Sequence, residues 1–256
     1  MERELIVKRI ESQVDATEKR LGVIAPGGGK INEGEFPLVS PPSVSFLIIV
    51  LGLGNTRIPD VVAPPLIENA AQALTAAGAD MILLGGLPVG FFQPRGYESE
   101  LTTRITNACG LPAATMAGAT VEALSRLNIK RPVVVSHYND RLNAGLRSLL
   151  SAYGIEAATI QSINQQRSAK SLADQEATDL YFGLARKAYV EAGESDGFLI
   201  SGGGTFSTVE IVNRLERDMG VPVVSSSLAA IWKSLRMLGY HEPIRGFGRL
   251  LGLMEA

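Results

Sequence analysis

Short runs of apolar residues alternate along the chain with longer stretches in which apolar residues recur every three or four positions. The short runs predict buried strands, and the longer stretches predict amphipathic helices. Strands are predicted at Arg20–Ala25, Ser43–Leu51, Asp80–Gly86, Pro112–Thr115, Pro132–Ser136, Ile155–Ile160, Phe198–Ile200 and Pro222–Val224. Helices are predicted at Pro64–Ala77, Glu98–Cys109, Gly118–Leu127, Asp140–Tyr153, Asp174–Ala192, in a stretch ending at Met219, and at Leu228–Leu238. This alternation favours an α/β fold with parallel sheets that helices cover on both faces.

Three stretches lie outside this alternation. Residues Glu2–Lys19 carry apolar side chains at helical spacing, which predicts an extra N-terminal helix packed on the body or on a partner. The segment Leu87–Tyr97 and the tail from Tyr240 onward are expected to be loops.

Glycines follow two of the predicted strands. Gly27–Gly29 come after the first strand, and Gly202–Gly204 come after Phe198–Ile200, with Thr205 leading into the next helix. Glycines there bring bare backbone N–H groups and a helix N-terminus close to whatever lies in front, which favours an anion or a developing oxyanion. A tight strand-to-helix turn with a hydroxyl cap is the alternative, and this stretch alone does not separate the two.

The sequence also repeats itself. The segment GADMILLGG at Gly78–Gly86 parallels SDGFLISGG at Ser195–Gly203, and GLPAATM from Gly110 parallels GVPVVSS from Gly220. The repeat predicts two pseudo-symmetric Rossmann-like lobes with the active-site cleft between them, at the carboxyl ends of the strands. We expect residues 20–116 plus 226–256 in the first lobe, residues 117–225 in the second, and residues 1–19 in the N-terminal helix.

Composition excludes several classes of protein. The net charge of −2 implies no general attraction to nucleic acid or an anionic membrane, and no apolar run approaches a membrane span. The single cysteine, Cys109, excludes an internal disulfide, and the two histidines, His137 and His241, lie too far apart to suggest a zinc cluster. The charged N-terminus is not typical of a secretory signal. A cytoplasmic protein is expected, and homo-oligomerisation stays open.

Several motifs are specific enough to indicate a family: IVLGLGNTRIP, SDGFLISGGGTFST and RLERDMGVPVVSSSLAAIW. With them the chain resembles the aspartate/glutamate racemase superfamily, in the branch of arylmalonate decarboxylase and maleate cis–trans isomerase, over nearly its whole length. The resemblance implies a two-lobed enzyme without cofactors, acting on a small carboxylate. It also implies a catalytic cysteine at the position of Gly202 and, in racemases, a second one at Gly86, and both residues are glycine here. Cysteine-based racemisation, protonation and adduct formation are therefore excluded.

The resemblance implies further site residues. Tyr138 matches the family's pocket tyrosine, and Asn143 matches the asparagine that follows it. Leu87 and Pro88 replace the hydroxyl residues that help to form the decarboxylase oxyanion hole, and Pro88 has no N–H to donate. The predicted substrate-binding set is Gly28, Asn55, Gly86, Leu87, Pro88, Tyr138, Asn143, Ser201, Gly202, Gly203, Gly204, Thr205 and Ser226.

The predicted catalytic residues are His137 and Tyr138. An imidazole titrates near neutral pH and can move a proton in place of the missing thiol. The alternative for His137 is a helix cap or a solvent-facing side chain. The alternative for the serines and threonines is capping of the helices that follow them. Arg57 is a second candidate for a substrate carboxylate, or an ordinary surface arginine.

These residues predict a lyase, decarboxylase-like, or an isomerase that stabilises an enediolate or another oxyanion without cysteine catalysis. Two alternatives stay open. One is a hydrolase that uses the same oxyanion-binding turn with an activated water. The other is a catalytically silent relative that binds a small carboxylate, which the loss of both cysteines supports.

Overall fold

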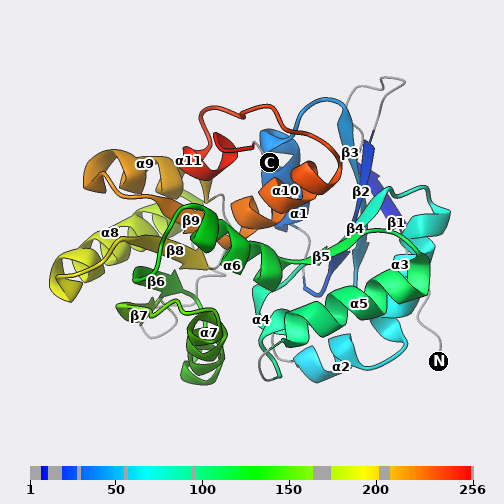
Figure 1. The fold of residues 1–256 in the computed structure, drawn as a ribbon, viewed down its shortest axis with the longest axis horizontal. Helices are drawn as coiled ribbons and strands as arrows, with labels where there is room; N and C mark the ends of the chain where they lie inside the picture. Colours follow the sequence, from blue (N-terminus) through cyan, green and yellow to red (C-terminus); the bar gives the residue numbers. More distant parts are fainter. Residues whose placement is uncertain are drawn as a thin grey trace.

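A computed structural model describes residues 7–10, 19–27, 30–54, 57–93, 96–163, 174–201 and 208–254. The strands form two sheets (Figure 1). The first sheet has the spatial order β1-β3-β2-β4-β5, with β1 (Val7–Ile10), β2 (Lys19–Ala25), β3 (Val44–Val50), β4 (Met81–Leu84) and β5 (Ala113–Thr115). The second has the order β7-β6-β8-β9, with β6 (Pro132–Ser136), β7 (Thr159–Ser162), β8 (Gly197–Ser201) and β9 (Val223–Ser225). The predicted α/β fold is confirmed.

The two sheets repeat one topology. Strands β3-β2-β4-β5 and β7-β6-β8-β9 are parallel throughout, and in each set the second strand in sequence lies at the edge beside the first. Helices α5 (Tyr97–Cys109) and α9 (Val209–Met219) both end at a glycine in the left-handed conformation, Gly110 with φ 73° and Gly220 with φ 72°. The sequence repeat therefore corresponds to two pseudo-symmetric lobes. Strands β2–β5 lie within residues 20–116 apart from Lys19, which begins β2, and β6–β9 lie within residues 117–225. The predicted lobe boundaries stay a prediction.

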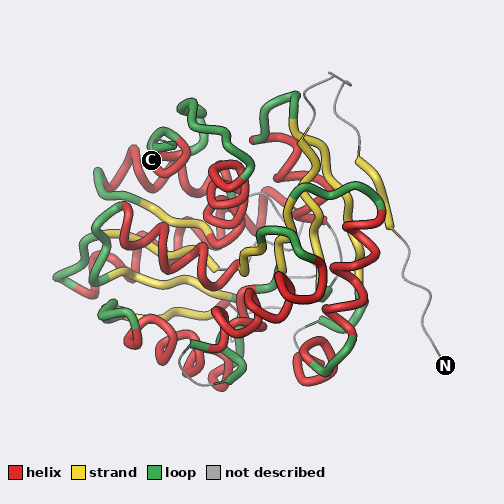
Figure 2. The backbone as a smooth tube through the Cα atoms, turned by 45° about the vertical axis from the view of Figure 1, so that its right-hand side comes forward, coloured by secondary structure: helices red, strands yellow, loops and turns green. Residues whose placement is uncertain are grey.

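Helices cover the faces of both sheets, and two of them lie between the sheets. Helices α6 (Met116–Arg126) and α10 (Ser226–Met237) pack against each other in the middle of the molecule, and α10 contacts strands of both sheets (Figures 1 and 2). The remaining helices are α1 (Lys30–Val39), α2 (Ile58–Val62), α3 (Leu66–Ala76), α4 (Leu87–Gly90), α7 (Asp140–Ala152), α8 (Asp174–Ala192) and α11 (Gly248–Leu251).

Strand alternation divides the apolar residues of the first sheet between two cores. On β4, Ile82 and Leu84 belong to the core that includes α3 and α5, whereas Met81 and Leu83 belong to the opposite one. This second core continues through α10, where Trp232 is fully buried, into the second sheet. The two lobes therefore share one hydrophobic core.

The predicted N-terminal helix is wrong for residues 7–10. They form β1, which pairs antiparallel with β3 from Val7↔Ile49 to Ile10↔Phe46. The open edge of β3 offers a row of unpaired N–H and C=O groups, and pairing with them overrides a weak helical spacing. The remainder of Glu2–Lys19 lies almost wholly outside the described residues.

Other boundaries also differ from prediction. Residues predicted as loop form α4, where the Pro88 ring fixes a helical φ in the first turn, and α11 in the tail. Helix α1 was not predicted, because Gly34 and Pro37 interrupt its pattern. Strand β7 begins at Thr159, so Ile155–Ala158 precede it as irregular chain.

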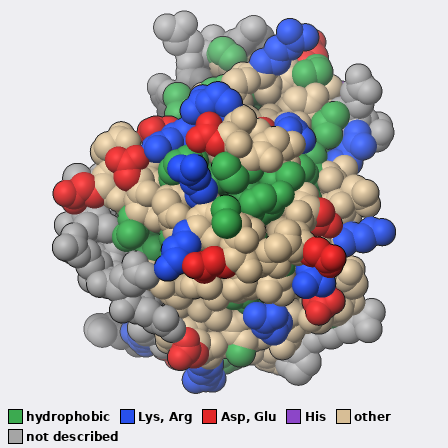
Figure 3. Space-filling view, turned by 90° about the vertical axis from the view of Figure 1, so that its left-hand side faces the viewer, with side chains coloured by type: hydrophobic (Ala, Val, Ile, Leu, Met, Phe, Trp, Pro, Cys, Tyr) green, Lys and Arg blue, Asp and Glu red, His purple; other side chains and the backbone are tan. Residues whose placement is uncertain are grey.

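The surface shows no segregation of charge on the face drawn in Figure 3, where basic and acidic side chains are mixed. Within the described ranges, no helix combines the length and the apolar character that crossing a membrane requires.

Candidate functional site

A serine ends each strand of the second sheet. Ser136 of β6 is in register with Ser162 of β7 and with Ser201 of β8, and Ser225 closes β9 one position further back, opposite Ile200. All four are buried. We call Ser162, Ser136, Ser201 and Ser225 the serine row. It lies at the carboxyl edge of a parallel sheet, which is where α/β folds bind their ligands.

Three members of the serine row hold Tyr138. The Ser201 hydroxyl donates to the phenol oxygen at 2.9 Å, and the Ser162 hydroxyl donates to the Tyr138 carbonyl at 2.5 Å. The Tyr138 amide donates to Ser136 Oγ at 3.3 Å. One residue is thus bonded to three adjacent strands through its backbone N–H, its carbonyl and its side chain, so its position is fixed by the sheet.

Asn143 adds to this support. Its Nδ2 donates to the Tyr138 carbonyl at 3.2 Å, and its Oδ1 accepts from Ser136 Oγ at 2.7 Å. Both ends of the amide therefore bind the turn between β6 and α7. The N-cap of α7 is Asn139, whose Oδ1 accepts from the Leu142 amide at 3.0 Å, so His137 is not the cap of this helix.

The phenol of Tyr138 lies in an apolar setting. Its side chain is 3% exposed, and burial raises its pKa above the ordinary value, with the Ser201 hydrogen bond acting in the opposite direction. The ring contacts Phe91 edge-on at a centroid distance of 6.2 Å and the half-exposed His137 ring at 4.6 Å. Tyr138 therefore stays protonated at neutral pH. Because Ser201 donates to the phenol oxygen, the phenol keeps its own proton to donate.

A second polar cluster surrounds Glu35 of α1. Glu35 Oε1 accepts from the Thr208 amide and from Thr208 Oγ1, both at 2.7 Å, and Oε2 accepts from Ser227 Oγ at 2.5 Å. Thr208 Oγ1 lies 2.6 Å from Ser225 Oγ, which lies 3.0 Å from Ser227 Oγ. We call these four residues the Glu35 cluster. Ser226, a predicted site residue, stands between two of them as the first residue of α10 and is 4% exposed.

Glu35 is the main functional candidate that the sequence analysis missed. It is 4% exposed, and burial raises its pKa, while the hydrogen bonds from Ser227, Thr208 and Val209 lower it in part. Nothing in its sequence context indicates a buried carboxyl group, since Gly34 and Pro37 hide the helix that carries it.

In the first lobe, the turn after β4, which corresponds to the turn after β8 in the second lobe, is apolar. Gly86 has φ 81°, and a Cβ atom added to it would lie 3.0 Å from Pro26 Cγ and 3.2 Å from Val89 Cγ2. Leu87 and Pro88 follow as buried residues of α4. The turn thus places no hydroxyl at the two positions where the resemblance implies them.

Several predicted site residues lie outside the described residues: Gly28, Asn55, Gly202, Gly203, Gly204 and Thr205. The oxyanion-binding turn at Gly202–Gly204 therefore stays a prediction. Arg57 is described, and its Nε bonds Asp60 Oδ2 at 2.6 Å on the surface.

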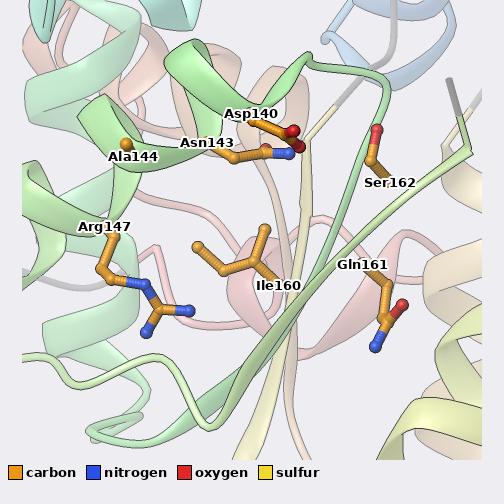
Figure 4. A pocket seen from close by; sticks show the side chains of 7 residues that line it. All are labelled: Asp140, Asn143, Ala144, Arg147, Ile160, Gln161 and Ser162. Atoms are coloured by element: carbon orange, nitrogen blue, oxygen red, sulfur yellow. The ribbon is translucent and has the colours of Figure 1, made fainter. Parts of the chain in front are cut away.

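A hollow of about 270 Å³ lies beside Asn143 and Ser162, two of the residues that donate hydrogen bonds to the Tyr138 carbonyl (Figure 4). Its walls come from α7 and from β7, so it lies within the second lobe. The lining residues are Asp140, Asn143, Ala144, Arg147, Ile160, Gln161 and Ser162.

The fold and this arrangement define a two-lobed α/β protein with polar groups gathered at the strand ends of one lobe. The family model described as arylmalonate decarboxylase matches residues 22–251, and the chain belongs to the arylmalonate decarboxylase family.

Individual relatives agree with this assignment. An arylmalonate decarboxylase of Bordetella bronchiseptica is 31% identical over 212 residues, covering 82% of this chain and 87% of the relative. A maleate isomerase of Nocardia farcinica is 30% identical over 138 residues, covering 53% of this chain and 52% of the relative. The crystal structure of unliganded arylmalonate decarboxylase superimposes with a TM-score of 0.75 at 28% identity, covering 91% of this chain and 99% of that one. The family comprises decarboxylases and isomerases that act on small carboxylates.

Proposed function

We propose that this protein is a cofactor-independent lyase or isomerase that binds a small carboxylate and stabilises an enediolate or a similar oxyanion without a catalytic cysteine. The observation that carries the proposal is the fixation of Tyr138 by three serines at the carboxyl edge of the second sheet. A hydrogen-bond donor held in place before the reaction stabilises developing negative charge without having to reorganise.

Tyr138 acts in this proposal as a donor to oxygen and not as a source of the transferred proton. Its raised pKa makes a buried tyrosinate unfavourable, and the same burial keeps the hydroxyl neutral and available to an anionic oxygen. The Gly202–Gly204 amides, if they face the same oxygen, would provide the other donors.

For a malonate-like substrate the electron balance is simple. The bond from Cα to one carboxyl carbon breaks, its electron pair enters the enediolate of the remaining carboxyl group, and carbon dioxide leaves. A proton must then be added at Cα. The family's thiol positions are Gly86 and Gly202 here, so we assign this proton to the His137 imidazolium or to a bound water.

The test is product analysis with purified protein. A 2-arylmalonate and maleate are incubated separately, and proton NMR follows the arylacetate and the fumarate. We expect one of the two products, and we expect His137→Gln to lower the rate strongly while the circular dichroism spectrum is unchanged. An unchanged rate in His137→Gln would assign the proton to water, and absence of both products would reject the lyase and isomerase proposals for these substrates.

A catalytically silent, carboxylate-binding relative is the second candidate. The conformation of Gly86 favours it, since a side chain there meets Pro26 and the backbone has a left-handed φ. Calorimetric binding of a carboxylate by a protein that turns over none would select this function.

A further inference from the structure

The Glu35 cluster connects the two lobes at a point that the proposed chemistry does not use. Glu35 belongs to α1, which packs on β3 of the first sheet and on α10. Two residues donate to it directly: Thr208, which precedes α9 in the second lobe, and Ser227, which lies in the first turn of α10 between the two sheets. Ser225, which ends β9, joins the cluster through hydrogen bonds with the hydroxyls of these two residues. One side chain thus holds three segments together.

The donors around Glu35 saturate its carboxyl group. Oε1 receives the Thr208 amide and hydroxyl, Oε2 receives the Ser227 hydroxyl, and the Val209 amide also donates to the group. A carboxylate offers about four lone-pair sites, which matches these four donors. Among the described residues, no charged side chain contributes to the shift of its pKa. The site is therefore built from hydroxyl and amide groups around one buried carboxyl.

The positions of these partners relate the cluster to the candidate site. Ser225 is the fourth member of the serine row, whose other three members hold Tyr138. Ser226, flanked by two cluster members, begins α10. Thr208 lies four residues after Gly204 in the sequence. The Glu35 cluster therefore holds the carboxyl edge of the second sheet in place at β9. The other three members of the serine row hold Tyr138 in place at β6.

We propose that Glu35 is a positioning residue for carboxylate binding, which acts through Thr208 and through the Ser225–Ser227 turn. This inference rests on the proposed function. Glu35 touches no reacting atom in this scheme. It orders the second-lobe side of the site from the first lobe, so that loosening it weakens ligand binding more than a buried carboxyl elsewhere would.

The experiment compares Glu35→Ala, Glu35→Gln and a matched control, Glu98→Gln. Glu98 is a second buried glutamate, 2% exposed on α5, which accepts from the Tyr153 hydroxyl. Among the described residues, the hydrogen bonds of the Glu35 cluster do not include it. Hydrogen exchange measures the Thr208 and Val209 amides, and calorimetry at 25 °C measures binding of a 2-arylmalonate and of maleate.

We expect Glu35→Ala to speed exchange of the two amides and to weaken carboxylate binding at least about tenfold, because it removes both carboxyl oxygens that accept from Thr208, Val209 and Ser227. Glu35→Gln keeps one carbonyl oxygen for Thr208 and restores binding to within about threefold of the wild type. Glu98→Gln binds as the wild type does. If Glu35→Ala does not fold, Ser227→Ala replaces it, with faster exchange and about threefold weaker binding expected.

Two results would overturn the inference. Faster amide exchange with unchanged affinity would reduce Glu35 to a cap of α9, and unchanged exchange would remove even that contact. A wild-type protein that binds neither carboxylate would instead overturn the proposed function, and the inference with it. Wild-type binding is therefore measured first, which keeps the two failures distinguishable.

Discussion

The carboxyl edges of the two sheets have the same topology and different chemistry. In the first sheet the strands β3, β2, β4 and β5 end at Val50, Ala25, Leu84 and Thr115, whereas the strands at the same places in the order of the second sheet end at Ser162, Ser136, Ser201 and Ser225. The four parallel strands follow the same order in both sheets. The fold therefore repeats, whereas the hydrogen-bonding groups are concentrated at one edge.

The turns beyond these edges show the same division. In the first lobe the turn after β4 becomes the apolar helix α4, and its continuation places Phe91 against Tyr138 and against Gly145 of α7. In the second lobe the chain leaves β8 at Ser201, bonded to Tyr138, and is described again at Thr208, bonded to Glu35. The first lobe supplies packing to the candidate site and one carboxyl group, that of Glu35, whereas the second lobe supplies most of the hydroxyl groups. The proposed binding of an oxyanion without cysteine rests on this asymmetry.

The largest effect is expected from Tyr138→Phe, which removes the hydroxyl and keeps the ring. Loss of one preorganised donor to an oxyanion lowers kcat by about 100-fold or more. Steady-state kinetics on the substrate found by NMR measures this loss. The control is Tyr153→Phe, which removes a hydroxyl that bonds Glu98 away from the serine row, and whose kcat should stay within about twofold of the wild type. Equal losses in both variants would contradict a special role of the Tyr138 hydroxyl.

Phe91→Ala tests the packing role of the first lobe. Phe91 is 7% exposed, and its ring lies 2.8 Å from the position of a Cβ added to Gly145, so it fits closely against α7. Truncating it should lower the free energy of unfolding by about 3 kcal/mol, measured by urea denaturation. Phe92, half-buried in the same segment, is the matched control and should lose less. A small decrease in the free energy of unfolding of Phe91→Ala would mean that the packing of Phe91 against α7 does not stabilise the second lobe.

Gly86→Ala measures how strongly the first lobe excludes a side chain at the position where the resemblance implies a cysteine in racemases. The left-handed φ of 81° and the contact with Pro26 should together lower stability by about 1 to 3 kcal/mol. Gly52→Ala is the control for φ alone, since Gly52 has φ 68° and no atom within 4 Å of an added Cβ. A loss of stability in Gly86→Ala no larger than that in Gly52→Ala would show that Pro26 moves aside at little energetic cost.

The sequence predicted the parts of the fold that rest on local pattern. Strand Pro132–Ser136 and helix Asp174–Ala192 were predicted at the bounds that the structure gives them, because both have clear periodicity. The errors fall where distant partners decide. Residues 7–10 pair with a strand that lies 36 or more positions away, and α1 contains a glycine and a proline that a local reading takes for helix breakers.

The candidate site follows the same rule. His137 and Ser201 were identified because they stand at strand ends, and Tyr138 because it matches the family's pocket tyrosine. The structure brings Ser201 to the phenol of Tyr138. Glu35 was not identified, because its partner Thr208 lies 173 residues further along the chain. Contacts of that span leave no periodic trace, so a buried carboxyl in an unassigned helix has no signal in a single sequence.

The smallest effect is a pH dependence that separates Glu35 from a neutral residue of the same shape. Burial raises the pKa of Glu35 above the value of 4.5 expected for an exposed glutamate. Between pH 4.5, the pKa of Glu35 in the unfolded chain, and its higher pKa in the folded protein, the folded protein binds more protons than the unfolded chain. Stability therefore falls as pH rises through this range. The contribution of Glu35 to stability is fully present below pH 4.5 and is lost as pH rises through the pKa of Glu35 in the folded protein.

Glutamine does not titrate. The free energy of unfolding of Glu35→Gln minus that of the wild type should therefore increase between pH 4.5 and the folded pKa of Glu35, and be constant below and above that range. Urea denaturation of both proteins from pH 4 to pH 8 measures the difference, in which all other titrating groups cancel. A difference that shrinks with pH would mean that the hydroxyl and amide donors around Glu35 outweigh its burial.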